Sequence, residues 1–201
     1  MKKIVSALAA LLVTTAIVSP VSAASLSHTV ASGDTMWKLA VKYQVGTSEI
    51  ILANPHVSNP NLIYPGQVLA IPQVDSSVTA FENEVIRLVN EIRVKNGLSA
   101  LNTNWELSRI ARYKSQDMVS NRYFSHTSPT YGSPFQMIKS FGLTYQSAGE
   151  NIAYGQTTPQ AVVNAWMNSS GHRANILNSS YKQIGVGYVA NGHYWTQLFI
   201  G

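Results

Sequence analysis

The absence of cysteine from a chain that opens like an exported protein constrains its fold more than any other feature. Two lysines, an uncharged apolar run over residues 4–18 and small residues ending at Ala23 predict a signal peptide over residues 1–23. The run is shorter than the ~20 residues that span a bilayer, so we expect no stable membrane insertion after cleavage. Without disulfides, the exported product must be held together by core packing alone, and an apolar content of 45% makes that feasible.

The charge of the chain argues against a nucleic-acid partner. Cleavage removes Lys2 and Lys3 and lowers the net charge from +5 to +3, and the remaining basic residues are scattered. Nucleic-acid binding needs a concentrated basic face. A mildly basic product instead suits residence among anionic wall polymers. We therefore expect a secreted protein that is extracellular or associated with the cell wall.

Residues 27–72 form a first unit with a βααβ pattern. Apolar residues at i, i+3, i+4 and i+7 from Met36 predict an amphipathic helix, and Asp34 in the preceding turn can cap it. The expected order is a strand over residues 28–30, this helix, a second helix over residues 48–53 and a strand over residues 68–71.

The stretches TVASGDTMWKLAVKY and NPNLIYPGQVLAIP make this unit resemble a LysM domain. The resemblance implies binding of N-acetylglucosamine-containing glycans, as found in peptidoglycan or chitin, and a groove between the two loops that these stretches contain. Backbone groups in tight turns can bond an acetamide while apolar side chains pack on the sugar. Purely structural roles stay open for Asp34 as a cap and for Ile63 and Tyr64 as core residues. The glycan-binding residues that the resemblance implies are Gly33, Asp34, Thr35, Met36, Asn61, Leu62, Ile63 and Tyr64.

Residues 73–78 are expected to form a short polar linker to a second unit over residues 79–201. Capping-box patterns at residues 79–82 and 103–106 each predict the start of a helix. Ser133-Pro134 predicts the start of a shorter third helix.

The end of the chain predicts a β-hairpin. Asn191-Gly192, the strongest short hairpin signal, lies between expected strands over residues 184–190 and 193–199. Gly185 and Gly187 leave one face of the first strand nearly bare, which indicates close approach by another element.

Two histidines and a carboxylate are the candidate chemical groups of this unit. Glu150 precedes a helix that Thr158-Pro159 starts, and His172 follows that helix after a glycine. His126 lies beside a turn rich in serine, proline and glycine. Such a set suffices for a metal site or for acid–base work. The same residues also fit a buried polar network that ties the turn to the helix end.

Four ordered stretches, YFSHTSP, AGENIAYG, AWMNSSGHRANIL and IGVGY with the later YWTQLF, resemble the bacterial SCP-domain branch of the CAP superfamily from about residue 79 to residue 201. The resemblance implies an α–β–α sandwich, so we expect an α+β protein in which a small βααβ LysM domain is joined to that sandwich. It also implies a cleft lined by a His/Glu tetrad. His126, Glu150 and His172 match three of its positions, and the fourth, a glutamate in many eukaryotic members, falls near Ser169. The tetrad is therefore incomplete.

Two functions from different classes follow from these expectations. The first is a non-enzymatic wall protein that binds peptidoglycan, or a chitin-like glycan, through LysM and presents a CAP domain whose ligand is unknown. The alternative is a metal-assisted hydrolase of wall or protein substrates, in which His126 and His172 hold Zn²⁺ or another divalent cation together with water or Glu150. Lipid or sterol binding in the CAP cleft ranks last. No GxSxG pattern offers a nucleophile.

Overall fold

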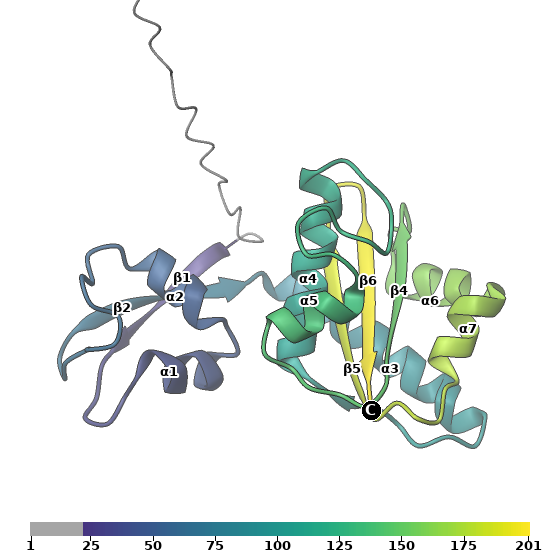
Figure 1. Cartoon of the computed structure of the whole chain (residues 1–201), viewed down its shortest axis with the longest axis horizontal. Coiled ribbons are helices and arrows are strands. Elements are labelled where there is room, and N and C mark those ends of the chain that lie inside the picture. The colour runs from purple at the N-terminus through teal and green to yellow at the C-terminus, as the bar shows by residue number, and fades with distance from the viewer. Residues whose placement is uncertain (1–21) are drawn as a thin grey trace, which may run out of the picture.

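The structure, a computed structural model, describes residues 22–201, which fold into two units (Figure 1). Most of the predicted signal peptide, residues 1–23, lies outside the described residues, and its cleavage stays a prediction. Within the described part, every helix is too short or too polar to cross a membrane.

The first unit is a two-stranded antiparallel sheet covered by two helices (Figure 1). Its elements are β1 (Ser22–Thr29), α1 (Met36–Tyr43), α2 (Thr47–Ala53) and β2 (Val68–Val74). Leu39 of α1, Ile50 of α2 and Leu69 of β2 are fully buried in one small core. The predicted βααβ order is confirmed, and apolar packing alone closes the unit.

The turn before α1 differs from the sequence expectation. The hydroxyl of Thr35, rather than the carboxylate of Asp34, caps α1 by accepting from a backbone N–H of its first turn at 3.1 Å. Asp34 instead accepts from a backbone N–H of its own turn at 2.8 Å and bonds Nε2 of His28 at 2.9 Å. His28 is buried and also bonds the hydroxyl of Tyr43 at 2.8 Å. Asp34 therefore ties the turn to β1 instead of starting the helix.

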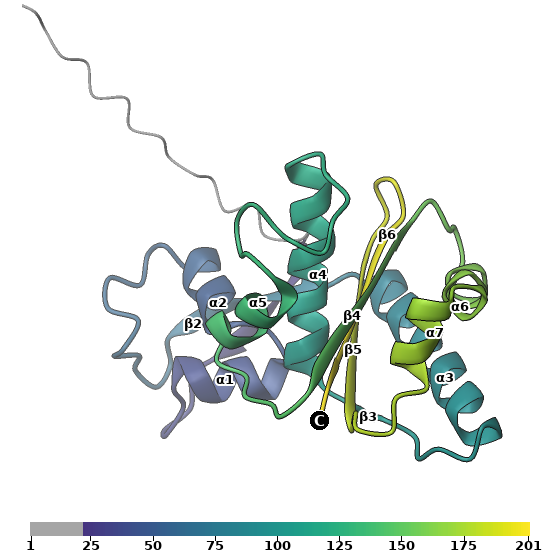
Figure 2. The same ribbon diagram turned by 45° about the vertical axis from the view of Figure 1, so that its right-hand side comes forward.

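The second unit is a four-stranded sheet between two layers of helices (Figure 2). The sheet order is β3-β5-β6-β4, in which β3 pairs parallel with β5 and the other pairs are antiparallel. Helices α4 and α5 cover one face, and α3, α6 and α7 cover the other, which confirms the expected α–β–α sandwich and the α+β class. The elements are α3 (Ser76–Lys95), β3 (Asn102–Thr103), α4 (Trp105–Ser120), α5 (Pro134–Ser140), β4 (Ala148–Tyr154), α6 (Pro159–Asn168), α7 (Ser170–Ile176), β5 (Gln183–Val189) and β6 (Tyr194–Ile200).

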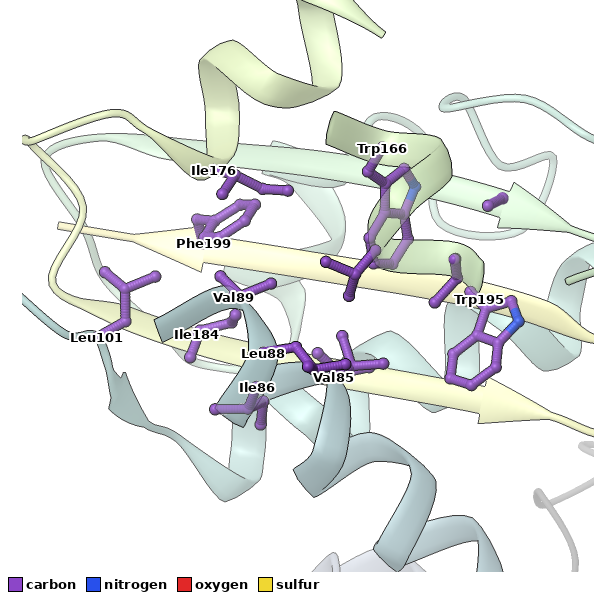
Figure 3. Packing of buried hydrophobic residues seen from close by; sticks show 14 of the residues in the cluster. Val85, Ile86, Leu88, Val89, Leu101, Trp166, Ile176, Ile184, Trp195 and Phe199 are labelled. Carbon is purple, nitrogen blue, oxygen red and sulfur yellow. The ribbon is translucent and has the colours of Figure 1, made fainter. Parts of the chain in front are cut away.

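Two apolar cores hold the sandwich together. In the larger core, Trp166 of α6 lies over the sheet near Trp195 and Phe199 of β6 (Figure 3). On the opposite face, Leu198 of β6 packs against Leu107 and other apolar residues of α4. Burying large aromatic side chains supplies much of the stability that disulfides would otherwise provide.

The bare strand face predicted at Gly185 and Gly187 is confirmed. A Cβ atom on Gly185 would lie 2.3 Å from the backbone of Leu107, and one on Gly187 would lie 2.1 Å from the backbone of Ala111. Helix α4 therefore rests directly on β5. The hairpin is also confirmed, with Asn191-Gly192 inside the loop between β5 and β6.

Three expectations about segment ends are wrong. Residues 73–78 do not form a polar linker, because β2 continues through Val74, and α3 begins at Ser76 with Asp75 as its cap. The capping box at residues 79–82 therefore lies inside α3. The second predicted box is displaced as well, since Asn104 caps α4 by accepting from the N–H of Leu107 at 3.0 Å.

Candidate functional site

The centre of the candidate site is a hydrogen bond between His126 and Glu150. Glu150 lies on β4, the edge strand of the sheet, and its side chain is only 2% exposed. Its Oε1 lies 2.6 Å from Nδ1 of His126, which comes from the loop between α4 and α5. An ionised carboxylate only accepts, so Nδ1 is the donor and Nε2 of the half-exposed imidazole is left as the acceptor.

Glu150 retains a second, uncommitted oxygen. Its Oε2 is buried and has no hydrogen-bond partner among residues 22–201. An orphaned carboxylate oxygen is costly to bury, so its persistence marks the position as a functional candidate.

His172 reaches the same region from the other side of the edge strand. It lies on α7, which packs against β4. Burial lowers its pKa below 6.5, and repulsion from the protonated form of nearby His126 lowers that pKa further. His172 is therefore neutral at neutral pH, and the structure brings the three sequence-predicted groups into one neighbourhood.

A network of amides fixes α7 against β4. The side-chain amide of Asn175 donates to the carbonyl of Glu150 at 3.1 Å and to Oδ1 of Asn151 at 2.9 Å. Asn151 is fully buried, and it donates to Oε1 of Gln197 at 2.9 Å and to the carbonyl of His172 at 3.1 Å. The network therefore sets the position of His172 relative to Glu150. Both asparagines lie inside the stretches that carry the CAP resemblance. That resemblance is the sequence signal that could have identified them.

Two charged residues of α4 hold the loop that carries His126, and the sequence reasoning missed both. Lys114 is almost fully buried, and its ammonium donates to the carbonyls of Ser125 at 2.7 Å and His126 at 3.0 Å. Three residues along, Asp117 accepts from the hydroxyls of Ser128 at 2.7 Å and Tyr123 at 2.5 Å. The available sequence signal was a cation and an anion, Lys114 and Asp117, spaced i, i+3 within the buried face of a helix.

The electrostatics of these two residues reflect their burial. Burial lowers the pKa of Lys114, although the nearby carboxylates of Glu150 and Asp117 raise it. Burial also raises the pKa of Asp117, but the hydrogen bonds from Ser128 and Thr130 outweigh it and leave that pKa below its usual 3.8. Asp117 is therefore ionised at neutral pH, and its carboxylate holds the loop through charge-assisted hydrogen bonds.

The donor set does not fit a metal ion as it stands. Within residues 22–201, no group of three or more His, Cys, Asp or Glu side chains is placed to hold one. Nδ1 of His126 is already bonded to Glu150, and Ser169, at the fourth tetrad position, contributes no carboxylate. Zn²⁺ at His126 and His172 stays a sequence prediction.

The two loops of the expected glycan groove lie at one end of the first unit. β1 and β2 pair up to Thr29 and Val68, and the two loops leave the sheet just beyond that pair. Two backbone hydrogen bonds of 2.8 Å join Val30 to Gly66 and Gln67, at the base of both loops.

The side chains of this groove divide into buried and exposed groups. Met36 is buried in the core and Ile63 packs partly against it, so their side chains serve folding first. Leu62 and Tyr64 are exposed to 51% and 60%, and they are the apolar side chains that remain available to a ligand. Gly33, with a φ of +85°, makes the tight turn opposite them.

Comparison with known proteins matches both units. A family model described as the cysteine-rich secretory protein family, CAP, matches residues 86–199, and a LysM domain model matches residues 28–72. The uncharacterized protein YkwD from Bacillus subtilis is 60% identical over 126 residues, which cover 63% of this chain and 49% of YkwD. A Staphylococcus aureus protein named "Probable autolysin SsaALP" is 40% identical over 57 residues, or 28% of this chain and 21% of that one.

A solved structure supports the same match. An extracellular protein with an SCP domain from Bacillus anthracis superposes with a TM-score of 0.59 at 32% identity, over 68% of this chain and 47% of that one. The chain thus spans about half the length of this protein and of YkwD, and much less of the staphylococcal relative.

Proposed function

Because this chain belongs to the cysteine-rich secretory protein (CAP) family and carries a LysM domain, we propose that it is an extracellular protein that binds peptidoglycan through LysM. In this proposal the protein is associated with the cell wall, and LysM holds the CAP domain beside the glycan. The CAP domain binds a ligand there without turning it over.

One observation carries the proposal. The turn at Gly33 and the loop at residues 61–64 leave the same end of the β1–β2 sheet, and that loop exposes Leu62 and Tyr64. Exposed apolar side chains beside tight-turn backbone suit an N-acetylated sugar, since the leucine side chain and the tyrosine ring cover its apolar face and the backbone bonds its acetamide. A single LysM unit lacks the gain in effective concentration of a tandem array, so we expect weak, reversible binding.

Co-sedimentation with insoluble peptidoglycan tests this function. The chain without residues 1–23 is compared with a Leu62→Ala, Tyr64→Ala double variant and with Phe135→Ala, an equally exposed aromatic in the CAP domain. We expect the double variant to bind about tenfold more weakly, equivalent to ~1.4 kcal/mol of lost contact, and Phe135→Ala to bind like the parent protein.

A parent protein that stays in the supernatant would overturn the proposal. A parallel pellet of chitin separates the two glycans. Binding to peptidoglycan that exceeds binding to chitin supports a wall role, and the reverse order contradicts it.

Hydrolysis without a metal is the second candidate, and the uncommitted Oε2 of Glu150 is the observation that favours it. Glu150 orients His126 through Nδ1, which leaves Nε2 able to take a proton from a water molecule. His172, held neutral by burial, supplies a second imidazole beside it. Bound water would be the nucleophile, because the sequence contains no GxSxG motif that would supply an activated serine.

Release of soluble fragments from purified peptidoglycan decides between the two functions. Release by the parent chain that is lost in His172→Ala would establish a hydrolase. Recovery of intact glycan with the protein in the pellet would leave a binding protein.

A further inference from the structure

Three aromatic side chains form an exposed patch on the CAP domain, which we call the aromatic patch: Phe124, Tyr154 and Tyr194. The ring centroids of Phe124 and Tyr154 lie 4.7 Å apart, and those of Tyr154 and Tyr194 lie 5.7 Å apart. Phe124 and Tyr154 are nevertheless 45% and 55% exposed. Rings that contact one another while facing solvent mark an interaction surface, because monomeric proteins otherwise bury such clusters.

The aromatic patch lines a groove rather than a flat surface. An open groove of about 510 Å³ lies between the end of α4 and the β5–β6 turn, with Arg122 and Asn191 at its rim. Both rim residues are exposed. Throughout residues 22–201, no carboxylate lies within ion-pairing distance of Arg122, so the groove presents a positive charge.

The aromatic patch shares two chain segments with the candidate site. Phe124 is two residues before His126 in the same loop, and Tyr154 lies on the same face of β4 as Glu150 because side chains alternate along a strand. Tyr154 pairs with Tyr194 across the sheet, just as Glu150 pairs with Leu198. Tyr154 is four residues along β4 from Glu150, which places their backbones ~13 Å apart, a distance that a short oligosaccharide spans. A ligand on the aromatic patch would therefore lie near the loop and strand that carry His126 and Glu150.

We propose that the aromatic patch binds the sugar rings of an anionic glycan strand, so that the CAP domain contacts the polymer directly. Sugars present apolar C–H faces for aromatic rings and hydroxyls for polar rims, and the patch combines ring faces with the Asn191 amide and the tyrosine hydroxyls. Arg122 complements the carboxylates of a wall glycan. The groove is too open to enclose an acyl chain. This inference rests on the proposed function for the identity of the polymer.

Chemical-shift mapping on the ¹⁵N-labelled chain without residues 1–23 tests this inference. The probe is soluble peptidoglycan glycan strands from which the peptide stems have been removed. We expect shifts at residues 122–126, 154 and 191–194 in addition to those in the LysM loops. Tyr154→Ala should weaken the affinity measured from the CAP-domain shifts at least tenfold, whereas Tyr154→Phe should retain that affinity. Phe135→Ala, the control, should leave it unchanged.

The outcomes separate this inference from the proposed function. Shifts confined to the LysM loops would overturn the aromatic patch as a glycan site and leave LysM binding intact. Shifts confined to the CAP domain would support the aromatic patch as a glycan site and overturn glycan binding by LysM. CAP-domain shifts that require strands with peptide stems, or that free stem peptides reproduce, would also overturn the aromatic patch as a glycan site, since the occupant would then be a peptide. Because Tyr154 is exposed, its variants should melt like the parent chain, and circular dichroism checks this.

Discussion

At the scale of single residues, the charge state of His172 is the feature most open to measurement. Burial and the charge of His126 both lower its pKa below 6.5, so the fold favours the neutral imidazole. The unfolded chain therefore binds more protons just below pH 6.5. Stability is undiminished above that pH and falls as the pH drops through 6.5 towards the folded pKa. NMR titration should place the His172 pKa below 6.5 and move it upward in His126→Ala. A pKa at or above 6.5 in the parent chain would contradict the burial of His172, and a pKa unchanged by His126→Ala would contradict its proximity to His126.

The buried lysine of α4 gives a second residue-scale prediction. Lys114→Met removes the donor of two partly buried hydrogen bonds to the carbonyls of Ser125 and His126. We expect a loss of about 2 kcal/mol in the free energy of unfolding and faster amide exchange over residues 123–130. Urea denaturation measures the loss, and Lys139→Ala, at an exposed position, should change stability by less than about 0.5 kcal/mol. Equal effects of the two variants would show that Lys114 does not support the loop.

The sequence predicted the three candidate groups of the site but not the residues that support them, and the physical reason is distance along the chain. His126, Glu150 and His172 have functional residue types, and resemblance marks them. Lys114 and Asp117 act through carbonyls and hydroxyls some 10 residues away, and no local pattern encodes such partners.

At the scale of elements, the contact of α4 with β5 depends on two glycines. A Cβ on Gly187 would lie 2.1 Å from the backbone of Ala111, and backbone cannot move aside as a flexible side chain can. Gly187→Ala should therefore cost about 3 kcal/mol of stability, measured by thermal or urea denaturation. Gly171→Ala is the matched control, because a Cβ there meets no atom within 4 Å and alanine favours the helix. A stable Gly187→Ala protein would show that α4 can shift away from the sheet.

Element types were predictable from the sequence more reliably than element ends. Period-2 and period-3.6 patterns reflect burial, so α6, β5 and β6 were predicted, whereas α7, the helix that carries His172, was expected to be a turn. The ends of the elements depend on which of several neighbouring residues caps the helix. Asp75 caps α3, so the helix begins before the capping box at residues 79–82. Glu82 from that box is instead buried, where it bonds Arg112 at 2.8 Å and the N–H of Tyr188 at 3.0 Å. Partners 30 and 106 residues away cannot be inferred from a local motif.

At the scale of the whole molecule, LysM is held against the CAP domain by a partly buried ion pair. Glu49 of α2 bonds Nε of Arg109 on α4 at 2.5 Å and accepts from the hydroxyl of Tyr113 at 2.9 Å. A cavity of about 250 Å³ beside the pair is lined by both domains. Only Asp75 separates β2 from α3, so no long flexible linker lets the two domains move apart. The LysM groove and the CAP site are therefore held in one orientation.

Removing the charge of Glu49 should release that orientation. Glu49→Gln leaves Arg109 partly buried without its anion, at a cost of about 3 kcal/mol to the interface. Burial raises the pKa of Glu49, but the hydrogen bond and charge of Arg109 outweigh it, so the folded pKa lies below 4.5. The contact should thus be complete above pH 4.5 and weaken as the pH falls through the folded pKa. Small-angle X-ray scattering should report a larger radius of gyration for Glu49→Gln at pH 7 and for the parent chain near pH 3. Glu84→Gln, which breaks an exposed pair with Arg87, should leave the radius unchanged at pH 7. A Glu49→Gln protein as compact as the parent would mean that packing around the cavity, rather than the ion pair, orients the two domains.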